Sequence, residues 1–104
     1  MQNITVKELK ERIAAGEQLN IVDVREPDEY AEFNIGAKLY PLSKIQSMQV
    51  EELEEWKDKE LIVHCRSGKR SLTACMFLET LGFTNTKNLE GGMLAWQEQQ
   101  GPVK

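Results

Sequence analysis

The chain has 104 residues, of which 40% are hydrophobic and 29% charged, and its formal net charge is −4 at pH 7. This length suits one domain, spanning residues 1–104, and an acidic chain of this kind is not expected to bind nucleic acid. No stretch approaches the roughly twenty apolar residues that cross a membrane, and the N-terminus does not resemble a secretory signal. We therefore expect a cytoplasmic protein that contacts no membrane.

Hydrophobic patterns and turn residues alternate along the chain in a way that predicts strands and helices in turn. Thr5 and Glu8 form a capping-box pattern before the first helix, and Pro27 suits the first turn of the second. The predicted strands are residues 4–5, 19–24, 38–40, 61–64 and 85–89, and the predicted helices are 6–16, a short one beginning near 27, 48–56, 71–81 and 93–99. This order predicts an α/β fold, with a mostly parallel five-stranded sheet between two layers of helices.

The most informative segment is Cys65-Arg66-Ser67-Gly68-Lys69-Arg70, which lies between the buried strand 61–64 and the buried helix 71–81. Backbone N–H groups of such a loop and of the helix start converge on one point, where the helix dipole adds positive charge. We expect the three basic side chains of the segment to surround the same point. Such surroundings favour thiolate over thiol, which predicts a lowered pKa and an accessible, nucleophilic sulfur for Cys65.

Ligands of parallel sheets bind beyond the carboxyl ends of the strands, which is where this segment lies. We expect Ser67 to form hydrogen bonds within the loop and Ser71 to cap the following helix. The predicted catalytic residue is Cys65, and the predicted substrate-binding residues are Arg66, Ser67, Gly68, Lys69, Arg70 and Ser71.

Other polar residues are weighed as parts of the scaffold. Asp23 and Arg25 follow a strand and could border the site, but we favour a pair between Arg25 and Glu29, with Asp23 holding a loop. His64 points to the sheet face opposite Cys65 and is expected in the core. Cys75, in the middle of an apolar helix, is expected to fill the core and not to act as a second redox thiol. With one histidine and two unpaired cysteines, the chain is expected to bind no metal or other cofactor.

Three segments in order resemble the single-domain rhodanese family. Ile21-Val22-Asp23-Val24-Arg25-Glu26-Pro27-Asp28-Glu29-Tyr30 resembles its first signature, and residues 65–70 resemble its six-residue active-site loop. Asn88-Leu89-Glu90-Gly91-Gly92-Met93-Leu94-Ala95-Trp96 resembles its closing segment, where a Gly-Gly turn precedes the last helix. The family usually has His-Ile-Pro-Gly-Ala after the Glu-Tyr helix, and the shorter Asn34-Ile35-Gly36-Ala37 stands here. The turn at that place, and a wall of the pocket, are expected to differ.

The resemblance implies a single three-layer α/β/α rhodanese-like domain and a sulfurtransferase of the thiosulfate type. In that family a cysteine, here Cys65, takes a sulfane sulfur from a small anionic donor such as thiosulfate and holds it as a persulfide. A thiol, cyanide or a protein then accepts the sulfur, without a metal or organic cofactor. Basic loops such as this one resemble thiosulfate users, whereas mercaptopyruvate users carry a neutral Cys-Gly-x-Gly loop. We expect a monomer.

Two alternatives stand beside this interpretation. Cysteine-dependent phosphatases and arsenate reductases use a cysteine, five residues and then an arginine, but Ser71 occupies that arginine's place and Arg70 comes one residue early. The smaller loop suits one extra sulfur atom better than a tetrahedral phosphate with its bidentate arginine, which disfavours this alternative. A module that carries a persulfide, or a signalling module, handing sulfur to a protein partner without much turnover of free thiosulfate, stays open as the second interpretation.

Overall fold

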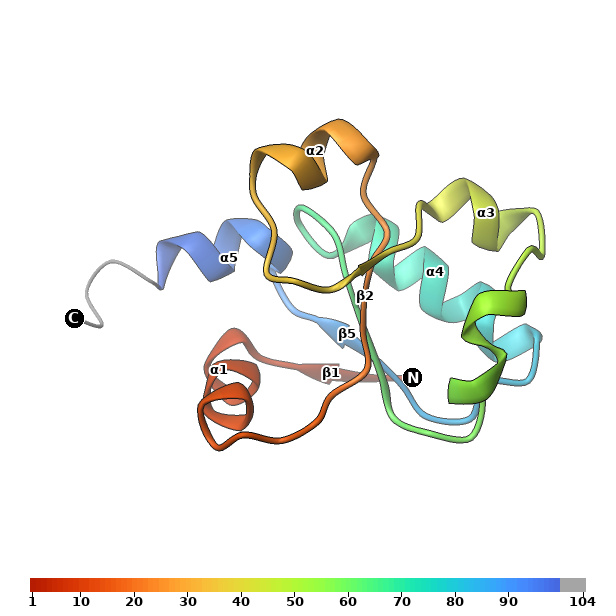
Figure 1. Ribbon diagram of the computed structural model, residues 1–104, viewed down its shortest axis with the longest axis horizontal. Coiled ribbons are helices and arrows are strands. Elements are labelled where there is room, and N and C mark those ends of the chain that lie inside the picture. Colours follow the sequence, from red (N-terminus) through yellow and green to blue (C-terminus); the bar gives the residue numbers. More distant parts are fainter. Residues whose placement is uncertain (100–104) are drawn as a thin grey trace.

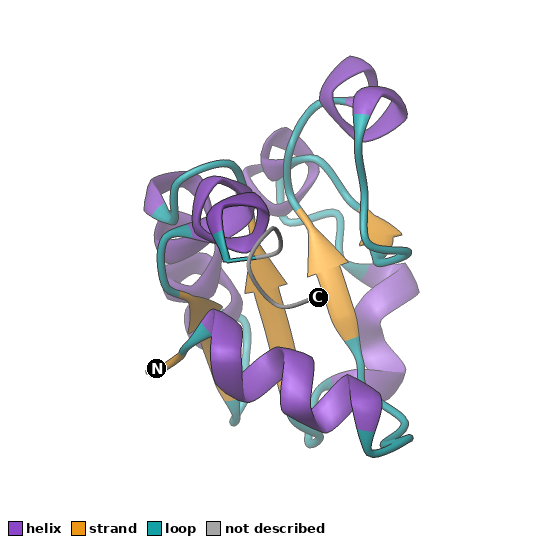
Figure 2. Cartoon of the chain, turned by 90° about the vertical axis from the view of Figure 1, so that its left-hand side faces the viewer, coloured by secondary structure: helices purple, strands orange, loops and turns teal. Residues whose placement is uncertain are grey.

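A computed structural model describes residues 1–99 of the chain. Its five strands form one sheet in the order β1-β5-β4-β2-β3, and all four pairings are parallel. Helices lie on both faces of this sheet (Figures 1 and 2). The elements are β1 (Gln2–Ile4), α1 (Val6–Ala14), β2 (Ile21–Asp23), α2 (Pro27–Glu32), β3 (Lys38–Leu39), α3 (Leu42–Gln46), the 3-10 helix η1 (Glu51–Trp56), β4 (Leu61–His64), α4 (Lys69–Thr80), β5 (Thr86–Leu89) and α5 (Gly92–Glu98). The predicted three-layer α/β fold is confirmed.

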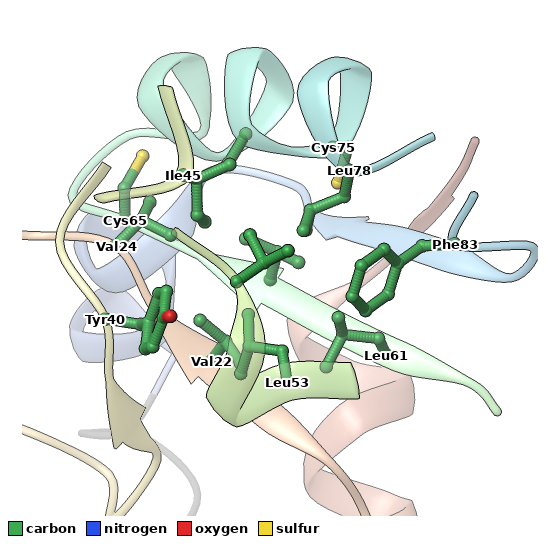
Figure 3. Packing of buried hydrophobic residues seen from close by; sticks show 13 residues of the cluster. Val22, Val24, Tyr40, Ile45, Leu53, Leu61, Cys65, Cys75, Leu78 and Phe83 are labelled. Carbon is green, nitrogen blue, oxygen red and sulfur yellow. The ribbon is translucent and has the colours of Figure 1, made fainter. Parts of the chain in front are cut away.

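Each face of the sheet packs on its own hydrophobic cluster, because successive side chains of a strand point to opposite faces. In β4, Leu61 and Val63 face α3, η1 and α4, whereas Ile62 faces α1 and α5. Figure 3 shows the cluster that contains Leu61 and Val63, with Cys65 at one end of it. The second cluster consists of Ile4, Val6, Leu9, Ile62, Leu89, Met93 and Trp96. The central strand is therefore fully covered, and its carboxyl end delivers Cys65 to a rigid place.

The segment before β4 differs from the prediction of one surface helix over residues 48–56. The chain instead forms α3, which was not predicted, and then η1. Met48 lies between them with a φ of +62°, in the left-handed region, so no continuous α-helix passes through this residue. The hydrophobic stripe that suggested a helix still packs inward, since Val50 and Leu53 are buried in the cluster beneath.

An ion-pair network ties α1 to the sheet at the end away from Cys65. Both terminal guanidinium nitrogens of Arg12 donate to the Glu60 carboxylate, at 2.8 and 2.5 Å, and Lys87 Nζ lies 2.6 Å from the Glu60 Oε2 atom. The hydrogen bonds from Arg12 are the main cause that lowers the pKa of Glu60 from 4.5 to about 2. Because the folded pKa lies below the ordinary value, this carboxylate stabilises the fold above pH 4.5 and progressively less as the pH falls towards 2.

We expect Glu60→Gln to lower the free energy of unfolding at pH 7 by about 1–2 kcal/mol, since charge-assisted hydrogen bonds are lost at a partly buried place. The difference from the unsubstituted protein should shrink as the pH falls from 4.5 towards 2, where both proteins lack the charge. Urea unfolding at several pH values measures it. Glu55→Gln, at an exposed position with no ion pair among residues 1–99, is the matched control. A difference that stays constant with pH would contradict the assigned ion pair.

Candidate active site

The loop after β4 is shaped by a glycine. Gly68 has a φ of +102° and is the N-cap of α4, which begins at Lys69. A left-handed conformation costs a glycine little, and here it turns the chain sharply into the helix. The helix therefore begins two residues earlier than the sequence predicted. The expectation that Ser71 caps it is wrong, because Ser71 lies inside the first turn.

This turn brings several donors to the Cys65 sulfur. The backbone N–H of Gly68 donates to Cys65 Sγ at 3.1 Å, and that of Ser71 donates at 3.3 Å. The Ser71 hydroxyl lies 3.4 Å from the same sulfur. Cys65 is only 1% exposed, which contradicts the expectation of an accessible thiol. The loop folds over the sulfur, so a reagent must be small to reach it.

The hydrogen bonds, and not the three cations, lower the pKa of Cys65. Burial raises the pKa of this thiol, but the hydrogen bonds at the sulfur, which come from Ser71, Gly68 and Ser67, lower it by more, so that it lies below its ordinary value. The side chains of Arg66 and Lys69 are exposed, where solvent screens their charge. The sequence thus predicted the direction of the shift but assigned too much of it to basic side chains.

The third cation, Arg70, is paired. Its two terminal guanidinium nitrogens donate to the two Glu29 carboxylate oxygens at 2.8 and 2.9 Å, and this is the main cause that lowers the pKa of Glu29 to about 2. The expected pair between Arg25 and Glu29 is therefore wrong. Arg66 and Lys69 form no ion pair with any of residues 1–99. The loop presents two unpaired cations and one that α2 holds in place.

Arg25 pairs with Asp23 instead of Glu29. Its Nε and Nη2 atoms lie 3.0 and 2.8 Å from Oδ1 and Oδ2 of the buried Asp23, and Nη2 also donates to the Phe33 carbonyl. His64 is fully buried beside this pair, with Nε2 3.8 Å from Asp23 Oδ2. Burial is the main cause that lowers the pKa of His64 to about 4, so the ring is neutral at pH 7. A core histidine is confirmed.

A hollow of about 110 Å³ opens beside the loop, between α2 and α5. Arg25 and Arg66 contribute to its wall, so Arg25 borders the neighbourhood of the loop, whereas Asp23 lies fully buried behind it. Cys65 does not line this hollow. The lining residues are Arg25, Glu29, Glu32, Phe33, Arg66, Met93, Leu94 and Gln97.

The shortened turn after α2 closes on itself. Asn34 Oδ1 accepts from the Gly36 N–H at 2.9 Å, and Asn34 Nδ2 donates to the Tyr30 carbonyl at 3.0 Å. The Tyr30 hydroxyl donates to the Ala37 carbonyl at 2.6 Å. The asparagine thus supplies local hydrogen bonds that form a compact turn without the family's histidine and proline.

Two residues that brace the loop were not predicted as part of the site. Asn88 Oδ1 accepts from the Ser71 hydroxyl at 2.5 Å, and its Nδ2 donates to the Gly68 carbonyl at 3.2 Å. At Gly92, a Cβ atom would come within 2.4 Å of the Cys65 carbonyl oxygen, so only glycine allows α5 this close to the loop. The N–H groups of Met93 and Leu94 can then donate to the Cys65 and Arg66 carbonyls, both at 2.9 Å. The only sequence signal for either residue was the resemblance of residues 88–96 to the family's closing segment.

Residues 1–99 contain neither a candidate metal site nor a helix that could span a membrane. No group of three or more His, Cys, Asp or Glu side chains in this range could hold a metal ion. None of its helices combines the length and apolar character that a membrane span needs.

We expect Cys65 to titrate below the free-thiol pKa of about 8.5. Because the amides carry the effect, Lys69→Met should leave the midpoint within a few tenths of a unit. Ultraviolet absorbance of the thiolate, with Cys65→Ser as the blank, measures it without requiring a reagent to enter, and Cys75 does not interfere because burial raises its pKa to about 11. A midpoint at or above about 8.5 would contradict a preformed set of donors.

Comparison with known proteins agrees with this architecture. A family model described as "Rhodanese-like domain" matches residues 5–99. YtwF of Bacillus subtilis, named as a candidate sulfurtransferase, is 40% identical over 102 residues that cover 98% of this chain and 96% of YtwF. A protein of Allochromatium vinosum named "Sulfurtransferase" is 32% identical over 103 residues, covering 99% of this chain and 94% of the relative.

A relative named as a candidate sulfur carrier and a solved structure are also similar to this chain. YrkF of Bacillus subtilis, named as a candidate sulfur carrier protein, is 34% identical over 94 residues, which cover 89% of this chain and 49% of YrkF. The crystal structure of a rhodanese-like domain protein from Staphylococcus aureus is similar with a TM-score of 0.80 and 36% identity, covering 92% of this chain and 91% of that one. The chain belongs to the rhodanese-like domain family, whose members include named sulfurtransferases and a candidate sulfur carrier.

Proposed function

We propose that this protein is a sulfurtransferase that moves a sulfane sulfur from thiosulfate, or a similar small anionic donor, to a thiophilic acceptor through a persulfide on Cys65. The observation that carries the proposal is the pair of backbone N–H groups, from Gly68 and Ser71, that point at the Cys65 sulfur. Donors fixed in this way stabilise negative charge on sulfur before the reaction begins. Membership of a family with named sulfurtransferases supports sulfur transfer as the general chemistry.

The reaction has two steps with one covalent intermediate. The Cys65 thiolate attacks the outer sulfur of thiosulfate, and a bond forms between Sγ and that sulfur. The sulfur–sulfur bond within thiosulfate breaks, and sulfite leaves with its electron pair. A second thiophile, a thiol or cyanide, then attacks the outer sulfur of the persulfide and restores the Cys65 thiolate.

The loop supports the charges that change during this sequence. The outer sulfur of the persulfide carries negative charge, which amides of the loop can stabilise as they stabilise the thiolate. Arg66 and Lys69, exposed at the loop, can attract a dianionic donor to a protein whose net charge is −4. Arg70, oriented by Glu29, adds a fixed positive charge near the sulfur. Its hydrogen bonds to Glu29 are the main cause that raises the Arg70 pKa, and the negative charge of Cys65 raises it further.

A sulfur carrier is the second candidate function. The similarity to YrkF supports it, and the 1% exposure of Cys65 suits a persulfide that is protected until a protein acceptor binds. Either function needs a reduced thiol, so we place the protein in the reducing cytoplasm. The two candidates differ in how fast free thiosulfate is turned over.

We expect thiosulfate treatment to add the mass of one sulfur atom to each chain, at Cys65. Cys65→Ser should abolish the adduct and all turnover, because burial raises the pKa of the other cysteine, Cys75, to about 11, whereas the pKa of Cys65 is lowered. Cys75→Ser is the control and should keep both. Intact mass and peptide mapping measure the adduct. Loss of transfer in a folded Cys75→Ser protein would contradict a one-cysteine mechanism.

We expect Lys69→Met to lower kcat/KM for thiosulfate about ten- to a hundredfold, as a lost charge-assisted hydrogen bond to the donor would. The cation acts on the donor, so use of a neutral sulfur donor should change little. Lys7→Met removes another exposed lysine, on α1, and serves as the control. Steady-state kinetics at fixed ionic strength decide the matter. Unchanged kcat/KM for thiosulfate in Lys69→Met would show that this lysine does not bind the donor, and negligible turnover of the unsubstituted protein would favour the carrier.

A further inference from the structure

The Asn88 side chain has one allowed orientation. Its amide group lies between the Gly68 carbonyl oxygen, 3.2 Å from Nδ2, and the Ser71 hydroxyl, 2.5 Å from Oδ1. A carbonyl oxygen can only accept, so the NH₂ group must face Gly68. The Asn88 oxygen must then face Ser71. The backbone of the loop thereby fixes which end of the amide the hydroxyl meets.

That orientation determines where the Ser71 proton goes. A serine hydroxyl carries one proton and can donate only one ordinary hydrogen bond. Asn88 Oδ1 has no proton, so at 2.5 Å the Ser71 hydroxyl must be the donor. The longer contact, 3.4 Å between Ser71 Oγ and Cys65 Sγ, then falls on the lone-pair side of the hydroxyl. Ser71 is fully buried, so solvent does not compete for this proton.

We propose that Asn88 is a positioning residue that withholds the Ser71 proton from the Cys65 sulfur. The hydroxyl accepts a hydrogen bond from the Cys65 S–H in the thiol form. In the thiolate form it offers no donor, and the backbone amides of the loop alone stabilise the charge.

This arrangement affects the reactivity of the sulfur and not only its protonation. A thiolate that is stabilised less strongly is a better nucleophile, and the best attacking thiol has a pKa near the ambient pH. A side-chain donor to the thiolate would lower the pKa further, and it would weaken the attack by each thiolate. Asn88 therefore keeps Cys65 reactive. It lies in β5, a strand that contributes no residue to the loop itself.

The other charged or titratable groups near Cys65 are expected to keep their charge state when Asn88 or Ser71 is substituted. Arg70 of α4 is held by Glu29 of α2, and Cys75 on α4 has a pKa raised to about 11. Tyr40 and Cys65 belong to the same cluster, and burial raises the Tyr40 pKa. His64 lies on the opposite face with a pKa lowered to about 4, while Arg66 and Lys69 point to solvent. Among residues 1–99, the Ser71 hydroxyl is the only side-chain group in hydrogen-bonding contact with the sulfur, and Asn88 contacts that hydroxyl.

The test is a double-mutant cycle on Asn88 and Ser71, read by ultraviolet titration of the Cys65 thiolate. Asn88→Leu removes the acceptor and frees the hydroxyl to donate to sulfur, so the midpoint should fall by about one unit. In the Ser71→Ala background, Asn88→Leu should produce no such fall. Ser71→Ala alone should leave the midpoint nearly unchanged or slightly lower, because the thiol and not the thiolate uses the hydroxyl.

A second readout separates this role from a structural one. The limiting alkylation rate of the fully ionised thiolate should fall about threefold in Asn88→Leu for each unit by which the midpoint falls. A loop that had merely loosened would show a raised midpoint instead. If Asn88→Leu does not fold, Ser71→Ala still decides, because a hydroxyl that donates to the thiolate would raise its midpoint by about one unit on removal. That rise, or an unchanged or raised midpoint in folded Asn88→Leu, would overturn the proposal. No sulfur donor is used, so the proposed function and this inference can fail separately.

Discussion

The structure depends on backbone N–H groups that converge on one sulfur atom. Gly68 makes this possible, because its φ of +102° turns the chain from β4 directly into α4 and aims the Gly68 and Ser71 amides at Cys65. The parallel sheet matters for the same reason: it places the end of its central strand against the start of a helix, where donors are left without partners inside the helix. The negative charge that this arrangement favours is held almost without exposure to solvent, which increases the strength of each hydrogen bond.

The donors stay in place because three other elements brace the loop. Gly92 lets the first turn of α5 donate to the carbonyls of Cys65 and Arg66, and Asn88 of β5 holds the Gly68 carbonyl from another side. On the remaining side, Glu29 of α2 fixes Arg70. A site built this way does not have to reorganise when charge develops on sulfur, which is the usual source of electrostatic catalysis. Its buried charges are satisfied locally, so the acidic surface of the protein does not oppose it.

The fold and the nucleophile could be predicted because both leave local signals. Apolar runs separated by turns indicated the strands, and a cysteine between a buried strand and a buried helix indicated Cys65. The ion-pair partners could not be predicted, because the choice among nearby and distant carboxylates depends on the complete fold. Arg25 pairs with Asp23, two positions before it, and Arg70 pairs with Glu29, 41 positions away. The backbone conformation of individual residues could not be predicted from the sequence either. The left-handed Met48 and Gly68 changed where helices begin and end, and the early start of α4 placed Ser71 beside the sulfur and not at a cap.

The most direct test of the central claim is a crystal structure of the protein after exposure to thiosulfate. Our interpretation predicts one additional atom bonded to Cys65 Sγ, lying within hydrogen-bond distance of backbone N–H groups of the loop, with Gly68 still in the left-handed conformation. An unmodified Cys65 in a crystal that thiosulfate has entered, or a sulfur atom on Cys75 instead, would contradict it. A persulfide that points away from the amides would show that the loop stabilises the thiolate and not the intermediate.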